Sequence, residues 1–164
     1  MDLSADPTWN ALAAELDSLA SASGAENAIV ADETSLLWCR ARAMTPLDTE
    51  RAFSRLAMAL GPDGGRDLAR GHKLRYAAAD VPPYTYAESF AGIYVLLLWF
   101  TEPFVEFRVH GLVHRALPEI ERLTVALPPP DGPDSTAGEA RKRALGRRSP
   151  RSIRARRSTA ALAP

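Results

Sequence analysis

Cysteine is almost absent from this sequence, since Cys39 is its only one. A single thiol excludes a disulfide within the chain and a thiolate metal cluster built by one chain. The N-terminus also lacks a basic stretch followed by an apolar one, so it carries no evident secretory signal. These absences favour a cytoplasmic protein in a reducing compartment.

Long hydrophobic runs are missing as well. The most apolar stretch, residues 93–100, is far shorter than the roughly 20 residues that cross a bilayer as a helix. The chain has 164 residues, of which 46% are hydrophobic, so it has room for one domain with a substantial core. We therefore expect a single soluble domain.

The formal net charge of zero conceals two regions of opposite charge. Residues 1–127 contain 17 acidic and 11 basic side chains, a balance of −6, whereas residues 128–164 contain 3 acidic and 9 basic side chains, a balance of +6. A proline-rich stretch at residues 128–133 separates them, and aliphatic residues are sparse beyond it. The sequence predicts a domain over residues 1–130 and a basic, disordered tail over residues 131–164.

Three amphipathic helices are predicted from apolar residues that recur at helical spacing. The first runs from Pro7 until Gly24, and the second from Leu47 to Leu60. The third carries its apolar stripe from Val109 to Leu127 and contains Pro118. Because an interior proline removes a hydrogen bond and clashes with the preceding turn, we expect Pro118 to kink or divide this helix.

Five short strands are predicted between these helices. They are expected at residues 27–31, 36–39, 73–79, 84–90 and 93–100. The first two flank a polar turn and should form a hairpin, and residues 84–90 alternate between two faces. The last is a continuous apolar run, which is typical of a central strand covered on both faces.

The expected order of elements is helix, two strands, helix, three strands, helix. Glycines break any periodicity between residues 63 and 72, so this stretch is expected to be a loop or a short helical turn. With only one helix between the groups of strands, helices layered on a mostly antiparallel sheet are favoured over a doubly wound parallel sheet. The sequence therefore predicts an α+β fold with the order α-β-β-α-β-β-β-α.

Several segments are similar to those of a known family. The segment S-F-A-G-I-Y-V-L-L-L-W-F at residues 89–100, with the helix that ends in Ile120-Glu-Arg-Leu123, resembles the last hairpin and C-terminal helix of the Roadblock/LC7 family. Residues 25–32 resemble its first strand. The resemblance covers residues 7–127 and rests on pattern and spacing. It implies a two-layer, profilin-like sandwich.

The resemblance also implies a function. Roadblock/LC7 domains form homodimers, or heterodimers with a similar domain, by joining two sheets edge to edge and pairing their second helices. Such dimers serve as platforms for small Ras-like GTPases, as in bacterial polarity and gliding motility, or as adaptors in motor and signalling complexes. The implied role is a non-catalytic scaffold that regulates or positions a GTPase, and no bound cofactor is implied.

The second helix has apolar residues on more than one face, which is more than a single buried stripe requires. The surplus could contact a partner, although such residues could also lie deep in the core of the monomer. Two tyrosines near the start of the fourth strand offer similar contacts, with stabilisation of an edge strand as the alternative. The candidate partner or dimer interface consists of Phe53, Leu56, Met58, Leu60, Tyr84 and Tyr86.

The basic tail supports an alternative function. Its arginines could bind the phosphates of nucleic acid or anionic lipid, which would make the protein a nucleic-acid-associated or membrane-surface adaptor. No aromatic residue interleaves with the arginines in residues 141–157, so base-specific reading of a single strand is unsupported. A solvated tether that binds the acidic body or an acidic partner is the favoured interpretation.

Three patterns that could carry chemistry are weak. His110 and His114 share a helix face, but they lack the glutamate of the zincin motif, so a solvated or dimer-facing pair is favoured over a metal-dependent hydrolase. Gly61–Gly65 lacks the lysine and hydroxyl residue of a phosphate-binding loop, which favours a plain turn. Cys39 has no patterned histidine partner and is expected to be packed as a small hydrophobe. We expect no catalysis.

Overall fold

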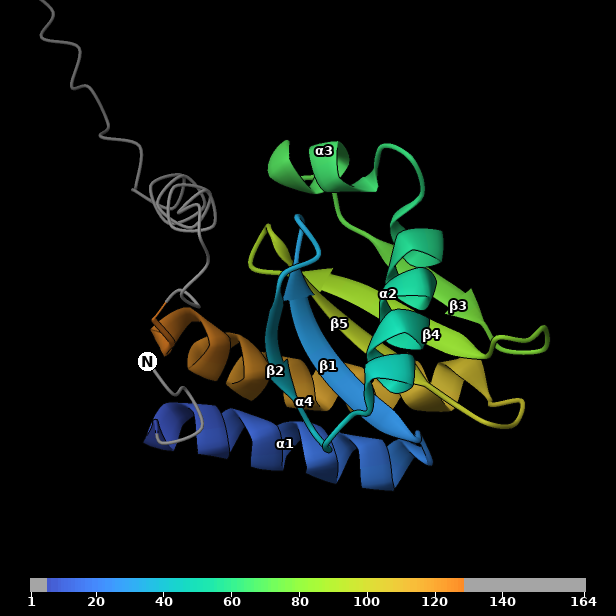
Figure 1. The fold of residues 1–164 in the computed structure, drawn as a ribbon, viewed down its shortest axis with the longest axis horizontal. Coiled ribbons are helices and arrows are strands. Elements are labelled where there is room, and N and C mark those ends of the chain that lie inside the picture. The colour runs from blue at the N-terminus through green and yellow to red at the C-terminus, as the bar shows by residue number, and fades with distance from the viewer. Residues whose placement is uncertain (1–5, 129–164) are drawn as a thin grey trace, which may run out of the picture.

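The computed structural model describes residues 6–128 of the chain. Within these residues it forms four helices and five strands (Figure 1). Their bounds are α1 Pro7–Ser23, β1 Asn27–Asp32, β2 Leu37–Arg40, α2 Pro46–Leu60, α3 Gly64–Ala69, β3 Arg75–Ala78, β4 Thr85–Phe90, β5 Tyr94–Trp99 and α4 Glu106–Ala126. The tail predicted at residues 131–164, and with it the predicted domain boundary, lies outside the described residues.

The strands form one sheet in the order β2-β1-β5-β4-β3, and every neighbouring pair is antiparallel. Strand β5 lies in the centre between β1 and β4, and all six of its residues are buried. This burial on both faces explains its unbroken run of apolar residues. The predicted α+β fold and the central position of this strand are therefore confirmed. The predicted element order is observed with the short helix α3 added between α2 and β3, where a loop or a short helical turn was expected.

Helices cover both faces of the sheet. Figure 1 shows α1 and α4 side by side beneath one face, whereas α2 crosses the other. Alternate residues of the strands therefore enter two separate cores: Leu98 packs among residues of α1 and α4, and Leu97 packs with Leu56 of α2. The sheet with α1 and α4 makes the expected sandwich, and α2 covers the opposite face together with Leu68 of the short helix α3.

The ends of α1 follow from local chemistry. The side chain of Asp6 accepts a hydrogen bond from the backbone N–H of Thr8 at 2.7 Å, and Pro7 fills the first turn, where no N–H donor is needed. At the other end Gly24 adopts a left-handed conformation with φ of 79°, and its N–H donates to the carbonyl of Ala20. Both ends of this helix match the sequence prediction.

Helix α4 differs from the prediction at two points. It begins at Glu106, nearly one turn before the first apolar residue of its stripe, because its first turn is exposed and so needs no apolar side chain. It also continues past Pro118 without interruption, so the expectation of a divided helix is wrong. Pro118 lies on the exposed side of the helix.

Among the described residues, no helix is long and apolar enough to span a bilayer.

The first hairpin is organised around the buried carboxylate of Asp32, which is 1% exposed. One carboxylate oxygen accepts from the backbone N–H groups of Thr34 and Leu36 and from the Thr34 hydroxyl, and the other accepts from the indole N–H of Trp38 at 2.9 Å. Ser35 completes the turn with a positive φ of 64°. A serine therefore occupies a conformation that favours glycine.

Replacing Ser35 by glycine is expected to stabilise the protein by about 0.5–1 kcal/mol, because a side chain in the left-handed region strains the backbone. Urea unfolding of Ser35→Gly measures this directly. Ser18→Gly on the exposed side of α1 is the control, and it should destabilise the protein by about 0.5 kcal/mol because glycine is a poor helix former. A loss of stability in Ser35→Gly as large as in the control would contradict the expectation.

Candidate functional site

Helix α2 is fixed at both ends by its own sequence. Thr45 and Asp48 form a capping box: the Thr45 hydroxyl oxygen accepts from the N–H of Asp48, and the Asp48 carboxylate accepts from the N–H of Thr45. Hydrogen bonds to Thr45 hold the pKa of Asp48 below its usual value. Gly61 ends the helix, and its N–H donates to the carbonyl of Ala57. The helix therefore presents a defined set of side chains.

One side of α2 packs against the sheet. Ala52, Leu56 and Ala59 are buried there, and Phe53 and Leu60 are partly buried in the same cluster. Small alanines allow the helix to lie close to the strands, and Leu56 fills the space between them. This side accounts for about half of the apolar residues of the helix.

The other side of α2 is open to solvent and partly apolar. Leu47 is 53% exposed and Met58 is 52% exposed, with the exposed Ser54 between them. Residues 7 and 11 positions apart lie on one line along a helix, so these three side chains form a single stripe. We call Leu47, Ser54 and Met58 the α2 stripe. A small residue between two exposed apolar ones is typical of a surface that packs against another helix.

Arg55 lies beside the α2 stripe and is incompletely paired. Its guanidinium carbon is 5.9 Å from the centre of the Trp99 ring, a cation–π contact. Its Nε atom is buried without a hydrogen-bond partner, and burial is the main cause that lowers its pKa. The Nε–H donor is therefore left unsatisfied, which costs free energy in this conformation.

Strand β3 is an open edge of the sheet. It pairs with β4 along one side only, and its residues Tyr76, Ala77 and Ala78 are half-buried. The opposite edge strand, β2, has an irregular register with β1 between Val30 and Ala31. A regular, unpaired edge is a ready template for a strand from another chain. Tyr76 packs in the same cluster as α2, so this edge and the helix adjoin.

The six residues predicted as a partner interface occupy different environments. Met58 is exposed, and Phe53, Leu60 and Tyr84 are half-buried. Leu56 and Tyr86 have no exposed surface at all, so they lie in the core of the monomer and cannot touch a partner in this conformation. Their neighbours explain this burial. Leu56 faces the sheet from α2, and Tyr86 packs in the core between the sheet and helices α1 and α4.

Tyr86 instead connects β4 to α4. Its hydroxyl donates to the carboxylate of Glu88 at 2.6 Å and lies 2.8 Å from Nδ1 of His110, whose Nε2 is 3.5 Å from a guanidinium nitrogen of Arg75. Burial, followed by the bond to Glu88, raises the pKa of Tyr86 well above its usual value. His110 is therefore half-buried in this network, whereas a solvated or dimer-facing residue was expected.

The neighbouring His114 is exposed, with its ring centre 6.1 Å from that of His110. Within residues 6–128, no three or more His, Cys, Asp or Glu side chains come together as a group that could hold a metal ion. Cys39 is buried as predicted, and burial raises the pKa of its thiol to about 12. A thiol with so high a pKa is a poor nucleophile.

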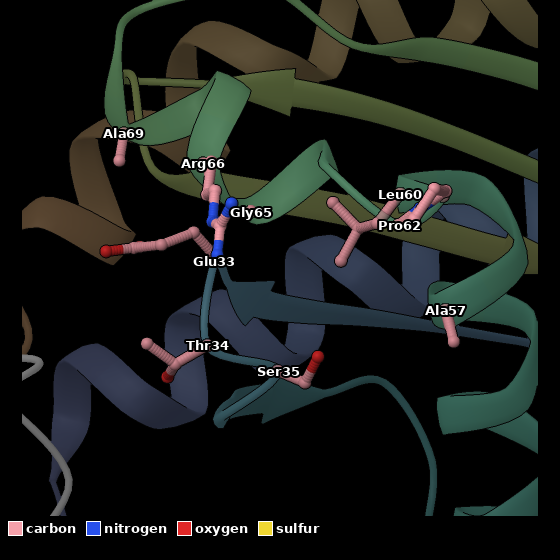
Figure 2. A pocket seen from close by; sticks show the side chains of 10 residues that line it. Glu33, Thr34, Ser35, Ala57, Leu60, Pro62, Gly65, Arg66 and Ala69 are labelled. Atoms are coloured by element: carbon pink, nitrogen blue, oxygen red, sulfur yellow. The ribbon is translucent and has the colours of Figure 1, made fainter.

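A surface hollow of about 520 Å³ lies between the β1–β2 turn and the end of α2 (Figure 2). Its walls include Glu33, Ser35, Leu60 and Arg66. One carboxylate oxygen of Glu33 is buried without a hydrogen-bond partner, and burial raises the pKa of this group, with a further contribution from Asp32. Glycine-rich residues 61–65 form a turn and the start of α3, as one of the sequence alternatives anticipated.

Gly65 allows α3 to approach the first hairpin. A Cβ atom at this position would lie 2.8 Å from the backbone oxygen of Glu33, so Gly65→Ala must displace one of the two segments. We expect this variant to lose about 1–2 kcal/mol of stability in urea unfolding. Gly111→Ala is the matched control, because a Cβ there meets nothing within 4 Å and alanine favours the helix. An equal effect of both changes would contradict the expectation.

Four exposed apolar side chains were not anticipated from the sequence, namely Leu47, Val81, Val105 and Phe107. These residues are 53%, 68%, 66% and 86% exposed. Phe107 lies outside the apolar stripe of α4, and this position could have indicated its exposure. The sequence did not reveal it, because the helix was expected to begin after Phe107.

Three solved structures are similar to this chain. Myxococcus xanthus MglB matches with a TM-score of 0.55 and 19% sequence identity, over 73% of this chain and 98% of that chain. An MglB with tetrameric arrangement matches with a TM-score of 0.46 and 18% identity, over 72% of this chain and 90% of that one. The gliding protein MglB from Thermus thermophilus also has a TM-score of 0.46, with 17% identity over 72% of this chain and 91% of that one.

The likeness to the Myxococcus protein shows a shared fold. It confirms the Roadblock/LC7-like fold expected from the sequence. No protein-family model matches the chain, and no curated protein matches it either.

Proposed function

We propose that this protein is a non-catalytic, dimeric scaffold that regulates or positions a small Ras-like GTPase. The observation that carries the proposal is that the α2 stripe and the open edge of β3 belong to adjoining elements. This surface combines exposed apolar side chains with unpaired backbone groups, and it lies on the side of the sheet that α2 covers. Both features favour protein association over binding of a small molecule.

The geometry of this surface supports a twofold dimer. Two copies related by a twofold axis bring the same elements of each chain together, so α2 packs against α2 and β3 adds to β3. The pairing continues the sheet across the interface, which satisfies the edge backbone groups, and covers Met58 and Leu47. The Roadblock/LC7-like fold supports this arrangement, since dimers of that family join sheet edges and pair their second helices.

The self-association is tested by the solution mass of the full chain, measured by light scattering over a range of concentrations. A dimer with dissociation constant of about 1 μM or lower is expected, which corresponds to about 8 kcal/mol of association free energy. The mass should change little between low and high salt, because the proposed contact is mainly apolar and backbone-mediated. A monomer at every concentration would contradict the homodimer.

The GTPase partner is tested separately. Small Ras-like GTPases, loaded with GDP or a non-hydrolysable GTP analogue, are titrated with the protein while fluorescence anisotropy is followed. A regulator must bind the two nucleotide states differently, and a tenfold preference corresponds to about 1.4 kcal/mol. Equal affinity for both states would contradict regulation and leave only positioning. Binding to neither state would remove the GTPase from the proposal while leaving the dimer intact.

The absence of catalysis is proposed from the chemistry of the described residues. The Tyr86, Glu88 and His110 side chains satisfy one another, and the Cys39 thiol is buried with a raised pKa. The expected result is that the protein alone hydrolyses no GTP, and that any change in the rate depends on the GTPase being present. GTP turnover by the protein alone would contradict this proposal.

A further inference from the structure

Four of the five exposed large apolar residues in the described chain lie at one end of the sheet. The antiparallel register brings Asn27, Ala78, Thr85 and Trp99 to this end, so the connections 79–84 and 100–105 adjoin it. Hydrogen bonds between Asn27 and Arg42 hold the segment that leads into α2 at the same end. We call it the loop end. Leu47, Val81, Val105 and Phe107 belong to it, and only Met58 lies elsewhere.

Two connections of the loop end are in direct contact. The backbone N–H of Phe104 donates to the carbonyl of Ala79 at 3.2 Å, which joins the β3–β4 connection to the one before α4. Figure 1 shows both on the right of the molecule. Val81 lies two residues after Ala79, and Val105 and Phe107 lie one and three residues after Phe104. We call these three residues the apolar patch.

The rim of the apolar patch is acidic. Asp80, Glu102 and Glu106 are exposed beside it, and Arg75 lies 3.8 Å from Glu106 and compensates part of that charge. Arg108 is the other basic residue nearby in the chain. An anionic membrane surface is disfavoured by this rim, whereas a segment with an apolar residue between basic ones fits it.

The chain itself contains such a segment. Residues 151–157 read R-S-I-R-A-R-R, which places Ile153 between arginines, and the whole of residues 128–164 has a balance of +6 against −6 in the body. We propose that the apolar patch binds this segment, with Ile153 against Phe107 and Val105 and the arginines facing Asp80, Glu102 and Glu106.

The length of the chain permits this contact. The start of α4 lies about 30 Å from its end at 1.5 Å per residue, whereas the residues between Leu127 and Arg151 can span more than about 70 Å when extended. The segment can therefore return along α4 within one chain or cross to a second copy. In either case the bound segment contacts the apolar patch and leaves the α2 stripe uncovered.

Hydrogen exchange of the full chain tests the contact. Backbone amides in residues 79–84 and 101–108 are compared between the wild-type protein and Ile153→Ser at low salt. A tethered segment has an effective concentration in the millimolar range, so even a weak contact of about 100 μM slows exchange roughly tenfold. We expect that protection in the wild type, its loss in Ile153→Ser and in Phe107→Ser, and its loss in high salt.

Leu145→Ser is the matched control, because Leu145 is also an apolar tail residue but lies outside the segment. It should retain the wild-type protection. Equal exchange in wild type and Ile153→Ser overturns the proposal, and so does an equal effect of Leu145→Ser. Protection gained only when phosphatidylglycerol vesicles are added overturns it in favour of a lipid occupant. Repeating the comparison on Met58→Asp separates this contact from the proposed dimer, since the α2 stripe takes no part in it.

Discussion

Met58→Asp is expected to convert the proposed dimer into a monomer. Met58 is 52% exposed on the α2 stripe, so the free monomer accepts a carboxylate there at a cost of only about 1 kcal/mol, from helix propensity and the helix dipole. In a twofold dimer the residue occurs twice at the helix pair, and two carboxylates lose their hydration in an apolar contact. We expect the dissociation constant to rise at least about 100-fold, or about 2.7 kcal/mol.

Light scattering and sedimentation of Met58→Asp measure this effect, and circular dichroism checks that the helices persist. Ala14→Asp is the matched control: it makes the same change of charge at an exposed position of α1, in the other helical layer. The control should remain a dimer. Dimers of equal strength in both variants would show that the α2 stripe is not the interface, even if the wild type self-associates.

Asp32→Ala is expected to cause the largest loss of stability of any single change in the first hairpin. The buried carboxylate accepts from two backbone N–H groups, from a hydroxyl and from the indole N–H of Trp38, which is itself 2% exposed. Removing the acceptor leaves buried donors unsatisfied, at about 1–3 kcal/mol each. We expect a loss of about 3 kcal/mol or more in urea unfolding.

Asp32→Asn separates the contribution of the hydrogen bonds to stability from that of the side chain's volume, because asparagine has nearly the same size as aspartate. The amide keeps one oxygen for the N–H groups of Thr34 and Leu36 but turns an NH₂ group toward the Trp38 indole, so it loses one acceptor. Its expected loss of stability is about 1–2 kcal/mol, between wild type and Asp32→Ala. A loss below about 1 kcal/mol in Asp32→Ala would mean that water replaces the carboxylate in this turn.

Much of the fold was predictable because its signals are local. Asp6, Pro7 and Gly24 bound α1 through their own backbone preferences, and the apolar run of β5 required a place covered on both faces. The alternation of residues 84–90 also placed Tyr86 and Ala87 on opposite faces, as the two cores confirm. Each of these signals acts within a few residues of the chain.

The start of α4 was less predictable. Apolar periodicity is visible only where a helix packs against other elements, and Glu106, Phe107 and Arg108 are exposed. The passage of α4 through Pro118 has a similar origin, since burial of Val113 and Ile120 on either side holds the helix together at the proline. A local preference is overridden when tertiary contacts on both sides supply more free energy than it costs.

The candidate interface shows the same limit. Phe53, Leu56, Met58 and Leu60 are all apolar residues of one helix, and the sequence contains nothing that ranks them by exposure. The sheet buries Leu56 and leaves Met58 exposed, because the rotation of α2 about its own axis turns Leu56 toward the strands and Met58 toward solvent. Ala52 and Ala59 set that rotation by their contact with the strands, and the strands belong to distant parts of the chain.

The sequence by itself therefore determined three of the helices and all five strands, their order, the mostly antiparallel sheet and the contrast of charge between body and tail. Only the tertiary structure decided that Leu56 and Tyr86 are core residues, that Asp32 anchors a turn to Trp38, and that four exposed apolar side chains gather at the loop end. The reason is physical: periodicity and capping depend on neighbours along the chain, whereas exposure and hydrogen-bond partners depend on segments that meet only when the chain folds.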